Sequence, residues 1–438
     1  MSTDISLSPP PRRPLFGLVD VNNFYVSCER AFNPRLANVP VVVLSNNDGC
    51  AVARSNEVKA LGIKMGAPWF QMKTLARQHG IVALSSNYAL YGDMSNRVMS
   101  ILRGFSPDIE VYSIDESFLR VETVAHLHGG AGAMGHAMRQ RIRQWTSLPV
   151  CAGFGGSKTL AKFANHLAKK NPLFDGVCDL AALSAAERQH WMEKYAVSEV
   201  WGVGHRLAAR LQSIGIRSVF DLASAHHPLI RRSFGVLLER TVAELQCTPC
   251  LDLEDLADPK QQIMVSRSFG SMVQDVAQLG EAVAWHIDRA AEKLRAQRSV
   301  AAAVYVFLQT NRFRPADPQH NPGMLVPLSD PSDDTRVLTQ TALHGLRQIH
   351  RCDCWYKKCG VMLLELTLKR QRQETLFDEP VARAPSSQLM TAVDAINRVW
   401  GRGTLRTGAA GMSSRSEMHA QHRSPRYTTR WDELPVAR

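Results

Sequence analysis

An α+β fold of several domains is predicted for this chain by three observations on its sequence. In the N-terminal part, apolar strands and amphipathic helices follow one another in the order β-α-β-β-α-β, which is that of a ferredoxin-like split motif. A Gly-x-Gly turn between two short helices at 195–225 is typical of a helix–hairpin–helix. From 263 to about 369, strands alternate with two long helices and predict a separate α+β domain. A chain of 438 residues has room for about three or four domains of ordinary size.

The first strand of the split motif, at 16–21, is an apolar run that carries Asp20 at its end. An amphipathic helix follows it. The run VPVVVLS at 39–45 predicts a second buried strand, and a basic segment punctuated by glycines, with a short helix near 55–61, comes after it. We therefore interpret the segment 39–85 as an insertion into the motif.

The remaining elements of the motif follow from the spacing of apolar residues. Two adjacent acids, Asp115 and Glu116, stand in the turn of its hairpin. In order, the elements are a helix at 88–104, hairpin strands at 109–114 and 117–122, a helix at 133–145, a strand at 149–155 and a helix from Ser157.

The composition indicates an anionic partner, because 52 Lys and Arg residues exceed 40 Asp and Glu residues and give a net charge of +12. Nucleic acid is the first candidate for such a partner. Residues 1–14 are polar and rich in proline, so they predict a disordered lead-in rather than a signal peptide. No apolar run is long enough to span a bilayer, which predicts a cytoplasmic protein with no membrane contact. The nine cysteines are then expected to be reduced, and the clusters at 247–250 and 352–359 lack the paired histidines that would favour zinc.

Three acids are expected to meet at the centre of the predicted sheet. In the split motif the first strand and the hairpin are neighbours, so Asp20 should lie beside Asp115 and Glu116. Three converging carboxylates repel each other unless cations lie between them, and Mg²⁺ prefers such hard oxygen ligands. Two magnesium ions about 3.5–4 Å apart could activate a sugar hydroxyl and stabilise a leaving pyrophosphate. The alternative is an exposed Asp-Glu turn with no function, which the position of Asp20 disfavours.

The helix from Ser157 has an apolar stripe and, on another face, Lys158, Lys162 and Lys169. A lysine face of this kind is either simply solvated or, beside a metal site, a set of phosphate ligands.

Several ordered motifs resemble the Y-family DNA polymerases, and most closely their UmuC-type catalytic subunits. They include VDVNNFYVSCE, SSNYALYGDMSNRVMS, YSIDESF, KTLAKFANHLAKK and SPRYTTR, and the resemblance extends from about residue 15 to 430. It implies an error-prone translesion DNA polymerase of the SOS response, a nucleoid-associated nucleotidyltransferase that uses two Mg²⁺ ions and no organic cofactor. The domains that it implies are a ferredoxin-like palm at 15–38 and 86–180, small fingers at 39–85, a helical thumb at 181–255, an α+β little finger at 262–370, and an extended tail at 371–438 with a clamp-binding motif and partner contacts.

The resemblance also implies roles for residues of the palm. Asp20, Asp115 and Glu116 match the metal-binding acids, and the carbonyl of Val21 is a further ligand. Tyr25 matches the steric gate, an aromatic side chain that packs under the sugar and disfavours a 2′-hydroxyl; the alternative is a core tyrosine.

Further roles concern the incoming nucleotide and the DNA. Lys169 matches the palm lysine that contacts the triphosphate. In the fingers, Asn56 and Lys59 replace the Tyr and Arg found elsewhere in the superfamily, and Arg54 is expected to share the triphosphate contact. The predicted DNA contacts, through which affinity should fall steeply with salt, are Gly202, Gly204, Arg206, Arg267, Arg312 and Arg314.

The pentapeptide QETLF resembles the motif by which such polymerases bind the sliding clamp, and its contacts would be Gln373, Leu376 and Phe377. Other partners implied are damaged primer-template DNA, deoxynucleoside triphosphates, a dimer of the processed UmuD-type subunit and a RecA-type recombinase filament. The tail at 380–438 is the expected place for some of these contacts.

Two other function classes share some of these features. A non-catalytic DNA-binding subunit would not need all three acids. A nucleotidyl cyclase shares a ferredoxin-like sheet and paired acids, but it would not need a helix–hairpin–helix or a basic C-terminal domain.

Overall fold

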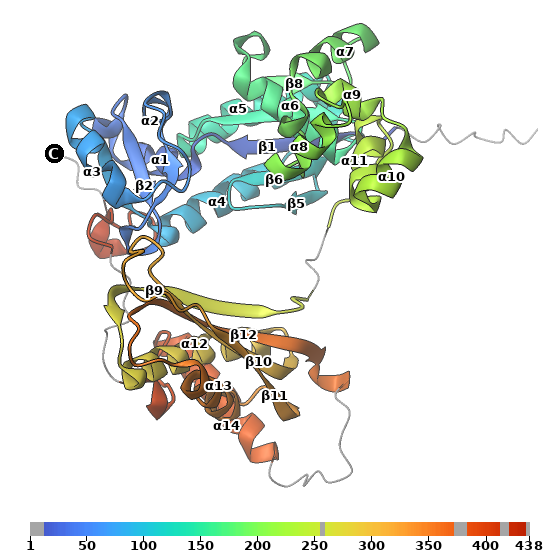
Figure 1. Cartoon of the computed structure of the whole chain (residues 1–438). Helices are drawn as coiled ribbons and strands as arrows, with labels where there is room; N and C mark the ends of the chain where they lie inside the picture. The colour runs from blue at the N-terminus through green and yellow to red at the C-terminus, as the bar shows by residue number, and fades with distance from the viewer. Residues whose placement is uncertain (1–12, 255–258, 372–382, 412–419, 435–438) are drawn as a thin grey trace, which may run out of the picture. The chain divides into compact units, whose positions relative to one another are not determined.

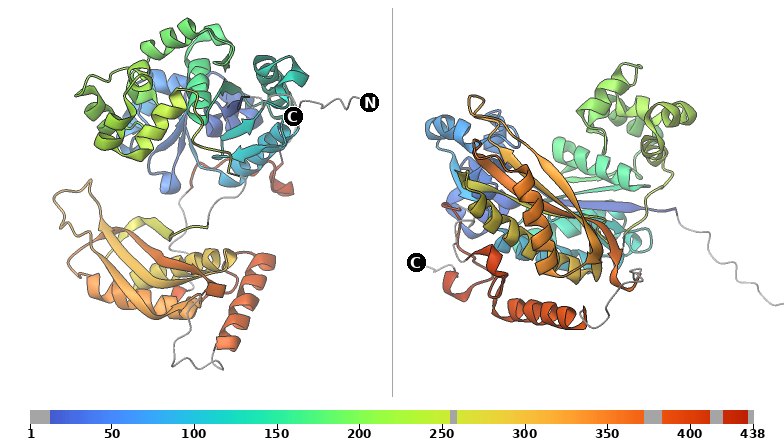
Figure 2. Two further views of the ribbon diagram at one scale, coloured as in Figure 1. Left: turned by 90° about the vertical axis from the view of Figure 1, so that its right-hand side faces the viewer. Right: turned by 60° about the horizontal axis from the view of Figure 1, so that its bottom comes forward.

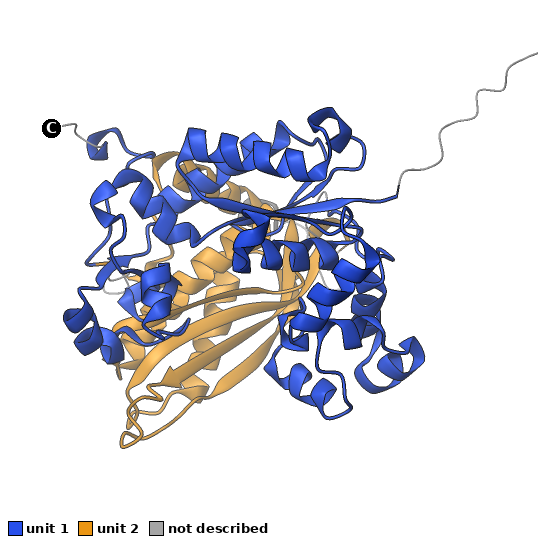
Figure 3. Cartoon of the chain, turned by 90° about the horizontal axis from the view of Figure 1, so that it is seen from above, with its two compact units in different colours: residues 1–256, 421–438 blue, residues 257–420 orange. Residues whose placement is uncertain are grey.

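The computed structural model describes residues 13–254, 259–371, 383–411 and 420–434. The chain divides into two compact units, one made of residues 1–256 and 421–438 and the other of residues 257–420 (Figure 3). Each unit is described by itself. Within the described ranges, no helix is both long and apolar enough to cross a membrane.

The first unit is built on a five-stranded sheet in the order β5-β6-β1-β7-β8. Strand β1 lies at its centre and is antiparallel to both β6 and β7. This arrangement confirms the predicted β-α-β-β-α-β order and the predicted hairpin. The strands are β1 (Phe16–Val21), β5 (Ile109–Val111), β6 (Glu116–Arg120), β7 (Val150–Gly155) and β8 (Val177–Asp179).

Helices cover both faces of this sheet, and the two-residue period of a strand assigns each side chain of β1 to one of them. Leu18 contacts the side of helix α6, whereas Val19 and Val21 belong to the core shared with the helices of the opposite face. The helices are α6 (Lys158–Lys170) on one side and α1 (Phe24–Phe32), α4 (Tyr88–Arg103) and α5 (Ala131–Thr146) on the other.

Helix α6 lies unusually close to β7 because β7 carries glycines at the contact. A Cβ added to Gly153 would overlap the backbone of Asn165, and one added to Gly155 would lie 2.6 Å from Leu160. The amide of Asn165 then donates hydrogen bonds to the carbonyls of Leu18 and Cys151, at 3.3 and 2.8 Å. The sequence VCAGFG thus brings the lysines of α6 next to the strand ends that carry the acids.

Between α1 and α4 the chain forms a second, three-stranded sheet in the order β3-β2-β4 with its own small core. Its elements are β2 (Val41–Leu44), β3 (Ala51–Arg54), α2 (Asn56–Ala60), α3 (Trp69–His79) and β4 (Val82–Ser85). The sequence analysis identified only β2 and α2 among these.

Short helices follow β8 and pack around a separate core that they share with α6. They are α7 (Ala185–Lys194), η5 (Val197–Glu199), α8 (His205–Gln212), α9 (Val219–Ala223), α10 (His227–Phe234) and α11 (Val236–Leu245). Gly202 has φ of 84° in the turn before α8, a left-handed conformation that glycine adopts without strain.

The second unit is a four-stranded antiparallel sheet in the order β11-β10-β12-β9. Two helices lie along one face of it, as Figures 1 and 2 show. The elements are β9 (Ile263–Val273), α12 (Val276–Ala296), β10 (Ser299–Thr310), β11 (Gly323–Ser332), α13 (Thr335–Ile349) and β12 (Tyr356–Leu368). Strand β11 was not predicted, because its residues alternate between exposed and half-buried around two prolines.

The prediction of an extended C-terminal tail is wrong for residues 383–400. Residues Arg383–Trp400 form helix α14, which Arg295 of α12 ties to the second unit through a two-pronged ion pair with Asp394, at 2.7 and 2.8 Å. Residues 421–434 belong instead to the first unit. The tail at 371–438 is therefore divided between the two units.

Candidate active site

Asp20 and Glu116 are direct cross-strand partners at the ends of β1 and β6. Both side chains project toward α6, because each is two residues away from a neighbour, Leu18 or Phe118, that packs on that side. Asp20 is 7% exposed. Asp115 lies one residue beyond Glu116 in the turn, where its carbonyl accepts a 2.9 Å hydrogen bond from the amide of Val21. The structure thus brings together the two acidic segments that the sequence places far apart.

A serine shapes the turn that presents the acid pair. The hydroxyl of Ser113 donates to the Asp115 carboxylate at 2.6 Å and accepts from the amides of Asp115 and Glu116, at 3.2 and 3.0 Å. The turn is therefore held by its own side chains, and the acids need no place in the hydrophobic core.

Three lysines of α6 pair with acids on three successive strands of the sheet. Lys158 pairs with Glu110 of β5, Lys162 pairs with Glu116 of β6 at 2.9 Å, and Lys169 pairs with Asp20 of β1 at 2.5 Å. The pair of Lys158 and Glu110 is buried, so Lys158 is not available to a phosphate and that alternative of the sequence analysis is wrong for it. Lys162, another of the candidate phosphate ligands, also lies 4.6 Å from the ring centre of Tyr112.

The donor atoms at the acids are of the kind that a divalent cation prefers. Burial raises the pKa of Asp20 to about 7 and the adjacent Glu116 carboxylate adds to this shift, although Lys169 acts in the opposite direction. Paired carboxylates and a backbone carbonyl are the hard oxygen donors that Mg²⁺ prefers. In the described part of the chain, no three His, Cys, Asp or Glu side chains converge on one point as metal ligands. The lysines neutralise the acids in this arrangement instead.

One pocket joins the acids to the second sheet of the same unit. Its walls hold the residues that were proposed for metal, sugar or triphosphate contact, except Glu116, Lys158 and Lys162. They are Asp20, Val21, Tyr25, Arg54, Asn56, Lys59, Asp115 and Lys169, to which the structure adds Asn23, Tyr88 and Lys170 among others.

Tyr25 is half-buried at this pocket and stacks on Tyr91 of α4 with ring centres 4.3 Å apart and planes 14° apart. Tyr88, which is 46% exposed, meets the Tyr25 ring edge-on at 6.2 Å. The ring is thus neither a fully buried core residue nor a free surface one. Tyr88 and Tyr91 are three residues apart, so they lie on one face of α4. This spacing is visible in the sequence and could have predicted that both rings contact Tyr25.

Several cationic side chains also line the pocket. Lys59 donates to the side-chain oxygen of Asn23 at 2.5 Å, and Asn23 donates to Asn56 at 3.0 Å. Burial lowers the pKa of Lys59, and the nearby Arg54 and Lys169 lower it further. Arg54 donates from Nη1 to the carbonyl of Ile63, but its buried Nε has no hydrogen-bond partner among the described residues. An unpaired guanidinium nitrogen beside ammonium groups favours an anionic ligand.

Of the predicted DNA contacts, five lie on exposed turns of their own units. Gly202, Gly204 and Arg206 are exposed around the start of α8, and Arg312 and Arg314 are exposed after β10. Arg267 differs, because its guanidinium stacks on Trp285 of α12 with its carbon 4.6 Å from the ring centre. It lies on the helix-covered face of the sheet, which argues against direct contact with DNA. Gln373, Leu376 and Phe377 lie outside the described residues.

Comparisons with known protein families match most of the chain. The impB/mucB/samB family matches residues 19–166, and its C-terminal domain matches residues 260–376. A domain of unknown function, DUF4113, matches residues 387–437.

Similar proteins are found along almost the whole length. Protein UmuC of Salmonella typhimurium is 42% identical over 96% of this chain and 99% of its own, and protein MucB of Escherichia coli is 41% identical over 97% and 99%. Among solved structures, the Y-family DNA polymerase chimera Dbh-Dpo4(243-245)-Dbh covers 81% of this chain and 99% of its own, with a TM-score of 0.63 and 21% identity. The insertion ternary complex of Dbh DNA polymerase has a TM-score of 0.52 at 20% identity over the same shares. These two structures are similar to the chain in fold.

Proposed function

The chain belongs to the UmuC-type branch of the Y-family DNA polymerases, the impB/mucB/samB family, and on this premise we propose that it copies damaged template DNA by a phosphoryl transfer that two divalent cations support. The observation that carries the proposal is the pocket of the first unit that Asp20, Tyr25 and Lys59 line. Carboxylates, an aromatic ring and cationic side chains line this one pocket together. A nucleoside triphosphate calls for all three groups, because its phosphates bind divalent cations and cationic side chains and its sugar can pack on an aromatic ring.

The acids are the proposed cation ligands. Asp20, Asp115 and Glu116, with the carbonyl of Val21, would hold two Mg²⁺ ions. When bound, these ions would supply the positive charge that lowers the pKa of the primer 3′-hydroxyl and stabilises the leaving pyrophosphate.

The lysines next to these acids have a second proposed role. Lys169 now neutralises Asp20 and Lys162 neutralises Glu116. When cations take the carboxylates, the ammonium of Lys169 becomes free to contact the triphosphate, which is the role that the family resemblance implies. Arg54, Asn56 and Lys59 would orient the phosphates within the same pocket.

Other residues are proposed to contact the sugar and the DNA. The ring of Tyr25 would pack beneath the deoxyribose and exclude a 2′-hydroxyl. Gly202, Gly204 and Arg206 of the first unit and Arg312 and Arg314 of the second would contact DNA phosphates, which hold the duplex without reading its sequence.

Primer extension on a template with one abasic site tests the proposed translesion activity. We expect products longer than the lesion position when the protein is assayed with a sliding clamp, a RecA-type filament and the processed UmuD-type subunit, which we propose as its partners in the SOS response. Undamaged template serves as the control. Extension that always stops one nucleotide before the lesion, with full activity on undamaged DNA, would contradict a translesion role.

The pentapeptide at 373–377 is the proposed clamp-binding site. Replacement of Leu376 and Phe377 by Ala should abolish most of the stimulation by the clamp and leave basal synthesis unchanged, because two adjacent apolar side chains would be lost from a partner's pocket. Primer extension with and without clamp measures both quantities, and Asp378→Ala is the matched control. Equal loss of basal synthesis would indicate misfolding, and unchanged stimulation would place the clamp contact elsewhere.

A further inference from the structure

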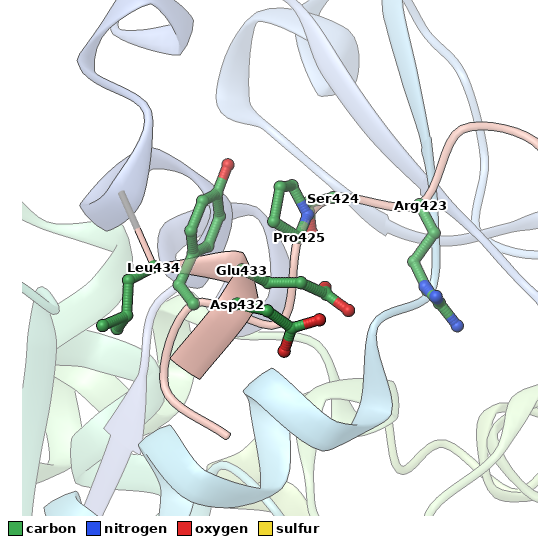
Figure 4. A pocket seen from close by; sticks show the side chains of 7 residues that line it. Arg423, Ser424, Pro425, Asp432, Glu433 and Leu434 are labelled. Carbon is green, nitrogen blue, oxygen red and sulfur yellow. The ribbon is translucent and has the colours of Figure 1, made fainter. Parts of the chain in front are cut away.

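Residues 421–434, near the C-terminus, pack against the segment that leads into α4. The amide of His422 donates to the hydroxyl of Ser85 and its carbonyl accepts from the Ser85 amide, both at 3.0 Å. Arg423 and Ser85 form a parallel β-bridge, so the segment extends the edge next to β4. Figure 4 shows the hollow that this segment forms with its own later residues, with Ser424 and Pro425 on one side of it.

Asn87 ties this C-terminal segment to the start of α4. Its side-chain amide donates to the Ser424 carbonyl at 3.1 Å, to the Ser424 hydroxyl at 2.9 Å and to the Pro425 carbonyl at 3.0 Å. Its side-chain oxygen accepts from the amide of Leu90, so the same residue caps the N-terminus of the helix. The two N–H groups of this buried side chain are shared among three acceptors of the C-terminal segment, and its oxygen caps the first turn of α4.

Glu29 of α1 provides a second link. Its carboxylate is 1% exposed and accepts hydrogen bonds from the hydroxyl of Tyr91 at 2.7 Å and from the hydroxyl of Ser424 at 2.9 Å. Burial raises the pKa of Glu29, and these two hydrogen bonds lower it. Close by, the ring of Tyr427 stacks on Phe32 at 5.0 Å with planes 10° apart.

These contacts connect the C-terminal segment to the ring of Tyr25, which lines the proposed nucleotide pocket. Tyr91 is fully buried and carries the stacked ring of Tyr25, and Tyr88, also from the first turn of α4, meets the same ring edge-on. The two rings that contact Tyr25 therefore belong to α4. Asn87 caps the first turn of this helix, and Glu29 accepts a hydrogen bond from its Tyr91 hydroxyl.

We propose that residues 421–434 position the sugar-discriminating ring, so that selection of deoxyribose over ribose depends on the hydrogen bond between Ser424 and Glu29. This gives a role to part of the region that matches DUF4113. The inference rests on the proposed function, since it concerns the sugar selectivity of the polymerase.

The physical reason is that the segment satisfies polar groups that are buried beneath it. Ser85, Asn87 and Glu29 are at most 2% exposed, and buried polar groups that lose a partner are costly. Without the Ser424 hydroxyl, the Glu29 carboxylate has to find water or another donor. The Tyr91 hydroxyl, which donates to Glu29, then no longer has an acceptor in a fixed position. The Tyr25 ring, which stacks on Tyr91, can therefore move away from the sugar.

The test compares Ser424→Ala with Ser424→Thr, which keeps the hydroxyl, and with Trp431→Ala in the same segment. Trp431 is 90% exposed, so its loss should have no effect. Single-nucleotide incorporation gives kcat/KM for a deoxynucleotide and for the matching ribonucleotide. For Ser424→Ala the ratio of the two should fall about fivefold, the size expected when one hydrogen bond is lost. Ser424→Thr and Trp431→Ala should keep the wild-type ratio.

A second variant, Tyr427→Leu, removes the stack on Phe32 and tests the same segment without changing Glu29; it too should lower the ratio. Thermal unfolding of each variant shows whether it is folded. Unchanged ratios in Ser424→Ala and Tyr427→Leu, with a lowered ratio in Tyr25→Ala, would overturn the inference and leave the proposed function intact. A ratio that stays constant in Tyr25→Ala as well would instead refute the assignment of the steric gate. An equal fall of this ratio in Trp431→Ala would also contradict the inference, because it would show that the loss comes from general destabilisation of the segment.

Discussion

Primer extension by the Asp115→Asn variant is expected to fall by at least about a thousandfold, with DNA binding and folding unchanged. Removing one negative ligand weakens the hold on the cations, and metal stabilisation of transition-state charge is worth several kcal/mol. A thousandfold loss corresponds to about 4 kcal/mol. Single-turnover extension measures the rate, and fluorescence anisotropy of a labelled primer-template measures the binding.

The matched control for this variant is Asp108→Asn, which removes the same charge from an exposed position of the same unit. We expect it to retain wild-type activity. Equal activity of wild type and Asp115→Asn would remove the catalytic role of the acids and favour a DNA-binding subunit that does no chemistry.

Replacement of Tyr25 by Ala should raise incorporation of ribonucleotides relative to deoxynucleotides by about ten- to a hundredfold. Forcing extra atoms into a filled site costs about 1–3 kcal/mol, and this penalty for the 2′-hydroxyl disappears when the ring is removed. The measurement is the ratio of kcat/KM for the two nucleotides in single-nucleotide extension. Tyr25→Phe keeps the ring and its stack on Tyr91, so it should keep the wild-type selectivity.

An unchanged sugar selectivity in Tyr25→Ala would make Tyr25 a core residue, the alternative that the sequence left open. Because the ring packs on Tyr91, thermal unfolding of the variant has to accompany the kinetics. A folded Tyr25→Ala variant with unchanged sugar selectivity would show that Tyr25 is not the steric gate.

The acids could be predicted from the sequence because their signals are local. An acid at the end of an apolar strand and an adjacent acid pair in a hairpin turn are both visible within a few residues, and the order of elements makes these strands neighbours. The lysine face of α6 could be predicted for the same reason. Which acid each lysine meets could not, because the pairing depends on how the helix crosses the sheet.

Long-range contacts account for the main failures. The tail was predicted to be extended because its composition is polar, yet α14 is held by an ion pair to a residue 99 positions earlier. Arg267 was predicted as a DNA contact, and that stays a prediction; its stack on Trp285 could not be predicted, because it depends on the register of β9 and on the packing of α12.

The sequence by itself determined the order of elements in the split motif, the family, and the residues able to bind cations and phosphates, since periodicity and motif spacing act over short stretches. The tertiary structure alone decided that the segment after residue 420 returns to the first unit and that Ser424 meets Glu29, 395 positions away. The physical reason is that a buried carboxylate requires hydrogen-bond donors, but nothing local to Glu29 specifies which part of the chain supplies them.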